Sequence, residues 1–132
     1  MMQTKVGRPG RSLGFTLIEL LVVMAIIATL GAIAAPRYFN SLEKSREVAL
    51  RANLKVMREA IDQFYQDNGK WPLALEDLVK NRYLREMPID PVTRETGTWV
   101  AVRPATGTEP GIRDVRSGAL GVPRDGTRYE DW

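Results

Sequence analysis

Residues 15–35 read FTLIELLVVMAIIATLGAIAA, an apolar run that is interrupted only by Thr16, Glu19, Thr29 and Gly31. At about 1.5 Å per residue, this run forms a helix roughly 31 Å long, close to the hydrocarbon thickness of a bilayer. A buried core helix is the alternative, but a chain of 132 residues has no core large enough to surround such a helix. The run therefore predicts one membrane-spanning helix.

A basic segment, residues 1–14, precedes the apolar run and carries Lys5, Arg8 and Arg11 without any acidic residue. Positive charges beside a spanning helix stay in the cytoplasm, so this distribution predicts that the C-terminal part is translocated. The whole chain has 19 Lys and Arg against 16 Asp and Glu, and the three basic residues of this segment account for its net charge of +3. Because the rest of the chain has no net charge, we expect no nucleic-acid partner.

A cleaved secretory signal is the rival interpretation of this region, because Ala32-Ile33-Ala34 is similar to a signal-peptidase site. The apolar run is longer than the usual signal, which has about 7–15 apolar residues, and it contains Glu19. A carboxylate costs about 2.5–3.5 kcal/mol at the middle of a bilayer and less near its edge. A simple export signal has no reason to carry that cost, so we expect Glu19 to have a partner.

The segment GFTLIELL at residues 14–21 resembles the type III signal of the type IV pilin and pseudopilin superfamily. The resemblance implies that a prepilin peptidase cleaves between Gly14 and Phe15 on the cytoplasmic side, and that the new amino terminus at Phe15 is N-methylated. It also implies that Glu19 of one subunit pairs with the Phe15 amine of its neighbour in a filament. Such a pair relieves two charges in a low dielectric and fixes the axial register of the subunits. The alternative for Glu19 is that its carboxylate only reaches the lipid headgroups.

Beyond the apolar run, the helical pattern continues through Asp67, and Asn68-Gly69 is a helix stop signal. Pro36 removes one backbone hydrogen bond and, with Gly31, marks a place for a kink or local unwinding; the superfamily commonly has a proline there. An apolar stripe with steps of 4, 3, 4 and 3 follows, formed by Leu50, Leu54, Met57, Ile61 and Phe64. The stripe is too short for a convincing coiled coil, so we expect it to pack beneath the chain's own C-terminal region rather than against a membrane surface.

The predicted organisation is a leader (1–14), a membrane and filament-core helix (15–36), an amphipathic helix (37–68) and a small globular region (69–132). The globular region is too small for an independent core and needs the helix stripe. Its expected elements are helical turns within 75–84, strands at 98–102 and 112–116 joined by a mobile hairpin loop at 104–111, and a turn at Asp125-Gly126 followed by a short strand around 127–129. Trp71 and Trp132 are expected to be packing residues. The fold class is α+β, a long N-terminal helix packed on a small antiparallel sheet, as in pilins.

The chain has neither cysteine nor histidine, which excludes disulfides, thiol or imidazole catalysis and the usual zinc sites. A membrane-anchored enzyme would then need a carboxylate pair in a cleft, and none stands out. The absence of cysteine is more typical of the major (G-type) pseudopilin of type II secretion than of an adhesive pilin. The order of motifs after the helix is also similar to the G-type pattern: Gly69-Lys70-Trp71-Pro72, Tyr83-Leu84, Met87-Pro88, Asp90-Pro91 and an aromatic strand.

The resemblance implies a structural subunit, not an enzyme, that crosses the bacterial inner membrane once and places its C-terminal region in the periplasm. The subunit would assemble with itself and with other pseudopilins into a helical periplasmic pseudopilus for protein secretion. Its other implied partners are the prepilin peptidase and the inner-membrane assembly platform. The alternative is a type IV pilin or minor pilin for twitching, adhesion or DNA uptake, which shares the same N-terminal half.

A calcium site is implied by the G-type resemblance, because that subfamily often holds its C-terminal loops with calcium. The candidate ligands here are Asp114, Asp125, Glu130 and Asp131. Calcium requires about six to eight oxygen ligands, and the subfamily's Asp-Pro-Trp-Gly is Asp90-Pro91-Val92-Thr93 in this chain. This departure and the short tail leave fewer loop oxygens. We therefore expect no strong metal site and no other cofactor, with Asp125-Gly126 acting only as a turn.

Overall fold

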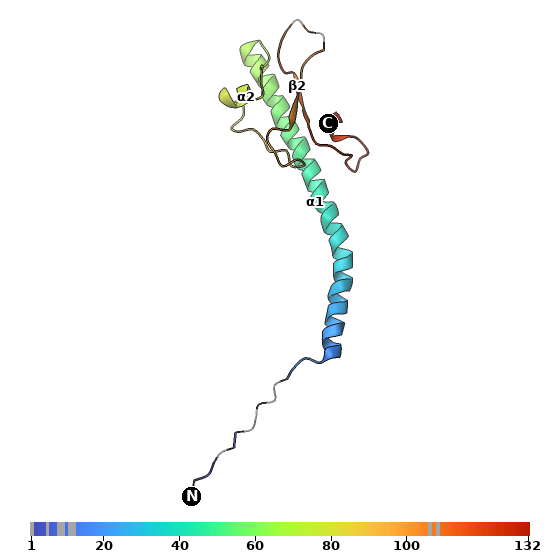
Figure 1. Cartoon of the computed structure of the whole chain (residues 1–132). Helices are drawn as coiled ribbons and strands as arrows, with labels where there is room; N and C mark the ends of the chain where they lie inside the picture. Colours follow the sequence, from blue (N-terminus) through green and yellow to red (C-terminus); the bar gives the residue numbers. More distant parts are fainter. Residues whose placement is uncertain (1, 5, 8–9, 11–12, 106, 108) are drawn as a thin grey trace. The chain divides into compact units, whose positions relative to one another are not determined.

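The computed structural model describes residues 2–4, 6–7, 10, 13–105, 107 and 109–132. Its elements, in chain order, are α1 (Leu17–Asn68), α2 (Glu76–Lys80), β1 (Trp99–Val102), β2 (Asp114–Ser117) and the 3-10 helix η1 (Tyr129–Asp131) (Figure 1). The chain divides into two compact units, Met1–Phe39 and Asn40–Trp132. The α+β pilin-like fold is confirmed. The three basic residues of the expected leader, Lys5, Arg8 and Arg11, lie outside the described residues.

The first unit contains the apolar half of α1. By length and composition, α1 is the one helix in the described part of the chain that could cross a membrane, with a mean hydropathy of 2.6 over its most apolar window. None of that window is buried inside the protein, so the interpretation as a buried core helix is wrong. Polar groups within the run are satisfied locally, since the Thr29 hydroxyl donates to the Ala25 carbonyl at 2.8 Å. The helix includes Pro36 without interruption, so it is not unwound there, and a kink at Pro36 stays a prediction.

The second unit is built on the apolar stripe of α1. Leu50, Met57 and Ile61 are 0% exposed. They form one core with residues from α2, the loops and both strands, namely Leu75, Leu78, Leu84, Trp99, Ile112 and Val115. The expected packing of the stripe beneath the chain's own globular region is therefore confirmed. Figure 1 shows α2 and β2 beside this part of α1.

The sheet is an antiparallel pair in which Trp99 is opposite Ser117 and Val102 is opposite Asp114. The first strand agrees with the sequence prediction, but β2 begins two residues later than expected. The reason is that the Ile112 amide donates to the Pro72 carbonyl at 2.8 Å, so Ile112 is tied to the turn after α1 rather than to β1. The connection between the strands is the expected hairpin loop; positions 106 and 108 lie outside the described residues, and its mobility stays a prediction.

The chain after β2 differs from the expectation. The turn at Asp125-Gly126 is confirmed, with Gly126 at a φ of 81°. The strand around 127–129 is wrong, because these residues lead into η1. The Thr127 amide and hydroxyl donate to Asp125 Oδ1 at 3.0 Å and 2.6 Å. These local bonds close the turn and override the strand preference of Thr127.

The expected aromatic anchors pack as predicted. Trp71 stacks on Tyr65 of α1 with ring centroids 4.1 Å apart. Gly111 lies against Trp71 at a φ of 133°, and a Cβ there would meet the Trp71 Cβ at 2.5 Å. A larger residue at this position would therefore displace the turn that follows α1. Trp132 is half-buried and packs against the same core.

Candidate functional site

The junction between Gly14 and Phe15 precedes the first turn of α1. Residues 13–16 are not helical, and a Cβ placed on Gly14 would meet nothing within 4 Å. The Phe15 side chain is 85% exposed. The bond expected to be cleaved thus lies in an exposed, non-helical stretch directly before a long helix, a backbone that a peptidase can bind in extended form.

Glu19 takes part in a capping box at the start of α1. Its amide donates to Thr16 Oγ1 at 3.2 Å, and its carboxylate Oε2 accepts from the Thr16 amide at 3.4 Å. Two of the amides that a helix N-terminus leaves unpaired are satisfied in this way. A carboxylate at this end of a helix is also favoured by the helix dipole. Glu19 therefore has a partner within its own chain.

Sequence reasoning missed the role of Thr16, although the signal was present. Thr16-Leu17-Ile18-Glu19 is a T-x-x-E pattern directly before an apolar helix, which is the signature of a capping box. Phe15 and Glu19 lie at the same helix end, and the structure brings Glu19 to Thr16. The pairing of Glu19 with the Phe15 amine of another subunit remains a proposal, as do the cleavage and methylation at Phe15.

The four acidic residues considered as calcium ligands do not form one group. Asp114 pairs with Arg58 Nε at 2.7 Å, Asp125 with Arg51 Nη2 at 2.8 Å, and Glu130 with Arg128 Nη1 at 3.1 Å. The donated bonds from Thr127, assisted by Arg51, hold the pKa of the Asp125 carboxyl below its usual value. Among the described residues, no cluster of three or more His, Cys, Asp or Glu side chains has an arrangement that could hold a metal ion. The expectation of no strong calcium site stays a prediction.

Asp90 is a structural residue whose burial the sequence did not reveal. Its side chain is 0% exposed. One carboxylate oxygen accepts from the amides of Val92 and Thr93 at 2.8 Å and 3.2 Å, and the other accepts from the Ser117 hydroxyl at 2.6 Å. Asp90-Pro91 was recognisable as a turn, but the partner from β2 was not. These bonds fix the loop before β1 to the end of β2.

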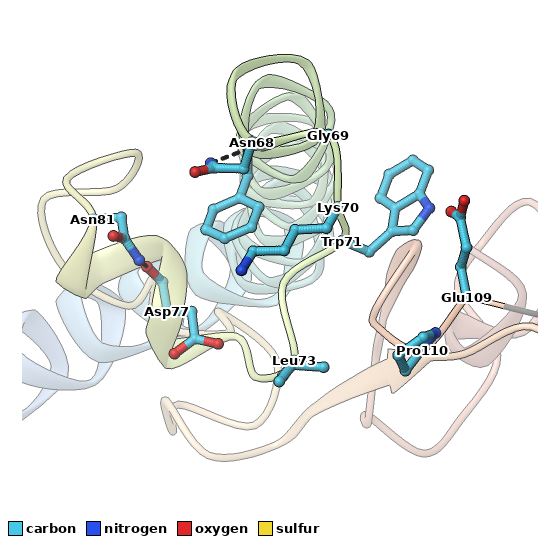
Figure 2. Close-up of a pocket in the computed structure, with 10 residues that line it drawn as sticks. Asn68, Gly69, Lys70, Trp71, Leu73, Asp77, Asn81, Glu109 and Pro110 are labelled. Carbon is cyan, nitrogen blue, oxygen red and sulfur yellow. Dashed lines mark hydrogen bonds between the residues drawn. The ribbon is translucent and has the colours of Figure 1, made fainter.

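A pocket of about 560 Å³ lies at the C-terminal end of α1 (Figure 2) and is lined by Phe64, Asn68, Gly69, Lys70, Trp71, Leu73, Asp77, Asn81, Glu109 and Pro110. Figure 2 shows Asp77 and Asn81 across the pocket from Trp71 and Glu109. The polar groups from α2 are engaged in its local structure, since Asp77 accepts from the Ala74 amide at 3.1 Å and Asn81 donates to the Asp77 carbonyl at 2.8 Å. Among the described residues that line the pocket, no nucleophile is hydrogen-bonded to a base.

Comparison with known proteins gives a family for the N-terminal region. Residues 10–35 match the family described as the prokaryotic N-terminal methylation motif. This span contains the Gly14–Phe15 junction, the capping box and the apolar half of α1.

Three relatives extend the comparison beyond this motif. The chain is similar to the type II secretion system core protein G of Pseudomonas aeruginosa, with 30% identity over 59% of this chain and 66% of that protein. It is similar to the protein of the same name from Escherichia coli K12, with 28% identity over 88% and 90%. It is also similar to the type IV major pilin protein PilE1 of Neisseria gonorrhoeae, with 26% identity over 86% and 65%. The chain belongs to the type IV pilin and pseudopilin superfamily.

The protein is accordingly a pilin-like filament subunit, from a family of structural subunits rather than enzymes. Its apolar α1 fits a membrane anchor of that family. The matched region spans about two thirds of the Neisseria gonorrhoeae and Pseudomonas aeruginosa proteins. No solved structure gives a significant match.

Proposed function

We propose that this pilin-like subunit is a structural subunit of the periplasmic pseudopilus of a type II protein secretion system. The observation that supports the proposal is the alignment with the core protein G of Escherichia coli, which spans 88% of this chain and 90% of that protein. It therefore includes the globular region, where pseudopilins and pilins differ. The alignment with PilE1 leaves about a third of that longer pilin unmatched, since it spans 65% of it.

Processing at Gly14–Phe15 prepares the chain for assembly in this proposal. Cleavage removes the basic leader, and N-methylation leaves a cationic amine at Phe15. The Glu19 carboxylate, held at the helix end by Thr16, then becomes the partner for the amine of a neighbouring subunit. Two opposite charges attract strongly in a low dielectric, so only the axial stagger that joins them is favoured. The pairing thus sets the register of the filament.

The topology follows from the same residues. The positive leader keeps the N-terminus on the cytoplasmic side before cleavage, so the second unit, Asn40–Trp132, lies in the periplasm. The apolar half of α1 anchors the subunit in the inner membrane until it enters the filament. The proposed partners are other copies of the chain, other pseudopilins, the prepilin peptidase and the inner-membrane assembly platform.

A type IV pilin or minor pilin, acting in twitching, adhesion or DNA uptake, is the second candidate. It is favoured by the alignment with PilE1, which covers 86% of this chain. The N-terminal half serves both functions equally, because both require the same processing and helix packing.

Deletion of the gene in its host distinguishes the two candidates. The strain is complemented with the wild-type chain, and both protein secretion into the medium and twitching motility are measured. We expect secretion to fail in the deletion strain and to return on complementation, with twitching unchanged. Loss of twitching with normal secretion would favour the pilin, and normal secretion in the deletion strain would contradict the pseudopilus function.

A further inference from the structure

The end of the chain, residues 120–132, is attached to the rest of the second unit through side chains. The hydrogen bonds described between main-chain groups of this segment all lie within it. The amides of Gly126, Tyr129, Asp131 and Trp132 donate to the carbonyls of Pro123, Gly121, Arg128 and Tyr129, respectively. Most of its side chains are exposed; Leu120, for example, is 91% exposed. Pro123 is the buried residue of the segment, and the half-buried rings of Tyr129 and Trp132 pack against the core. Burial therefore anchors the segment at these three residues and leaves the rest of it exposed.

Charged groups on one side of α1 contact this segment in a definite order. Glu43, Glu47, Arg51 and Arg58 follow one another at steps of 4, 4 and 7 residues, so they lie along the same face of the helix. The first two are acidic and the last two are basic. The segment presents charges in the complementary order.

The acidic part of this face holds Arg124. Its Nε is 3.8 Å from Glu43 Oε2, and its amide donates to Glu47 Oε1 at 3.2 Å. The next residue, Asp125, has the opposite charge and reaches Arg51 Nη2 at 2.8 Å. A shift of the segment by one turn toward the N-terminus of α1 would place Asp125 beside Glu47, which has the same charge. The charge order therefore disfavours that shift.

The basic part of this face holds the last residue of the segment. The Arg51 guanidinium carbon lies 3.9 Å from the centre of the Trp132 ring, a cation–π contact. Arg58 Nη2 donates to the Trp132 carbonyl at 2.8 Å and to the Val115 carbonyl at 3.0 Å, while its Nε donates to Asp114 at 2.7 Å. One arginine thus joins α1, β2 and the end of the segment.

We propose that residues 120–132 form an ionic clasp, a segment closed onto α1 by Glu43, Glu47, Arg51 and Arg58 that opens without unfolding the core beneath it. The pairs are exposed, with the side chains of Arg51 and Asp125 retaining 59% and 41% of their surface. Exposed pairs are individually weak and are screened by salt. The core stripe is apolar and does not share this dependence on salt.

Hydrogen exchange of the full chain in detergent, followed by mass spectrometry, tests the clasp. Sodium chloride is raised from about 0.1 M to about 1 M, which shortens the screening length from about 10 Å to about 3 Å. We expect exchange in residues 120–132 to accelerate about two- to fivefold, which corresponds to losing ion pairs worth up to about 1 kcal/mol. Residues 50–64 of α1 serve as the internal reference and should not change. Equal exchange of residues 120–132 at both salt concentrations would overturn the clasp.

Three variants assign the effect to charge. Arg51→Gln should give the fast exchange already at low salt, while Arg51→Lys, which keeps the charge but loses the planar group on the Trp132 ring, should exchange at a rate between those of Arg51→Gln and the wild type. Lys80→Gln is the charge control, because Lys80 is an exposed residue at the end of α2 and no contact between it and residues 120–132 is described; its exchange should match the wild type. If Arg51→Lys is as fast as Arg51→Gln, or if Lys80→Gln opens the segment equally, the ionic clasp is contradicted. If a variant also accelerates hydrogen exchange in residues 50–64, its core has been disrupted as well as the clasp. Asp125→Asn, which changes the segment alone, then distinguishes loss of the clasp from loss of the core.

Discussion

Glu19 caps α1 in the structure and pairs with a neighbouring subunit in the proposed filament, and these two roles require different properties of its side chain. Capping of α1 requires only an acceptor oxygen aimed at the Thr16 amide, 3.4 Å away. Pairing with an amine on another subunit requires a negative charge. An amide side chain keeps the first property and loses the second, so substitution can separate the roles. Any substitution that removes the carboxylate also removes the cost of placing it in the membrane.

Glu19→Ala and Glu19→Gln should both insert into the membrane at least as well as the wild type, and neither should assemble. Glu19→Gln should keep the helix cap, whereas Glu19→Ala should lose the hydrogen bond from the Thr16 amide, worth about 0.5–1.5 kcal/mol. Membrane fractionation measures insertion, and electron microscopy of the host measures filaments. Thr29→Ala is the control, because the Thr29 hydroxyl bonds only its own helix carbonyl in the described structure. Normal filaments from Glu19→Gln would show that charge at this position does not set the register.

Processing at the Gly14–Phe15 bond is a second prediction at the level of single residues. The mature chain isolated from its host should begin with N-methylated Phe15, as measured by mass spectrometry of the intact protein. Gly14→Ala should be processed only slightly less well, because a Cβ at Gly14 meets nothing within 4 Å in the chain itself. A bulky residue at position 14 should leave the precursor uncut. A mature chain that begins near Pro36 would instead support the secretory-signal interpretation.

At the level of elements, the apolar stripe on α1 forms one side of the core of the globular unit. Met57→Ala should destabilise the protein by about 2–5 kcal/mol, because the Met57 side chain is fully buried and its removal leaves a cavity. Val56→Ala is the neighbouring control; Val56 is 49% exposed, so the cost should be below about 0.5 kcal/mol. Chemical denaturation of the full chain in detergent, followed by tryptophan fluorescence, measures both. If Met57→Ala costs no more than Val56→Ala, the stripe faces another subunit instead.

The elements that the sequence predicts well are those defined by a local pattern. The stripe of Leu50 to Phe64 and the β1 residues from Trp99 follow from helical and strand periodicity. The elements predicted badly depend on partners distant in sequence or on local bonds that compete with a strand. Ile112 is bonded to Pro72 rather than to β1, and Thr127 is bonded to Asp125. The burial of Asp90 could not be foreseen because its partner, Ser117, is 27 residues away.

At the scale of the whole molecule, the small globular unit is closed without a disulfide, since the chain contains no cysteine. Its apolar core joins α1 to α2 and the sheet, while its last segment relies on arginine–carboxylate pairs. The carboxylates of Asp114 and Asp125, which a calcium ion would need, accept hydrogen bonds from Arg58 and Arg51 instead. A bound cation would have to displace these guanidinium groups and would meet their positive charge nearby.

We therefore expect calcium to leave the stability of the protein nearly unchanged. A specific ion at a hundredfold excess over its Kd would raise the free energy of unfolding by about 2.7 kcal/mol. For a unit the size of Asn40–Trp132, this corresponds to a rise in Tm of at least about 10 °C. Thermal melting of the full chain in EDTA and in millimolar calcium should instead give midpoints within a few degrees. A large rise that requires calcium and disappears in Asp125→Ala would show that the ion displaces Arg51, and it would favour the pseudopilin over the pilin, because calcium in the C-terminal loops is what the resemblance to the G-type subfamily implies.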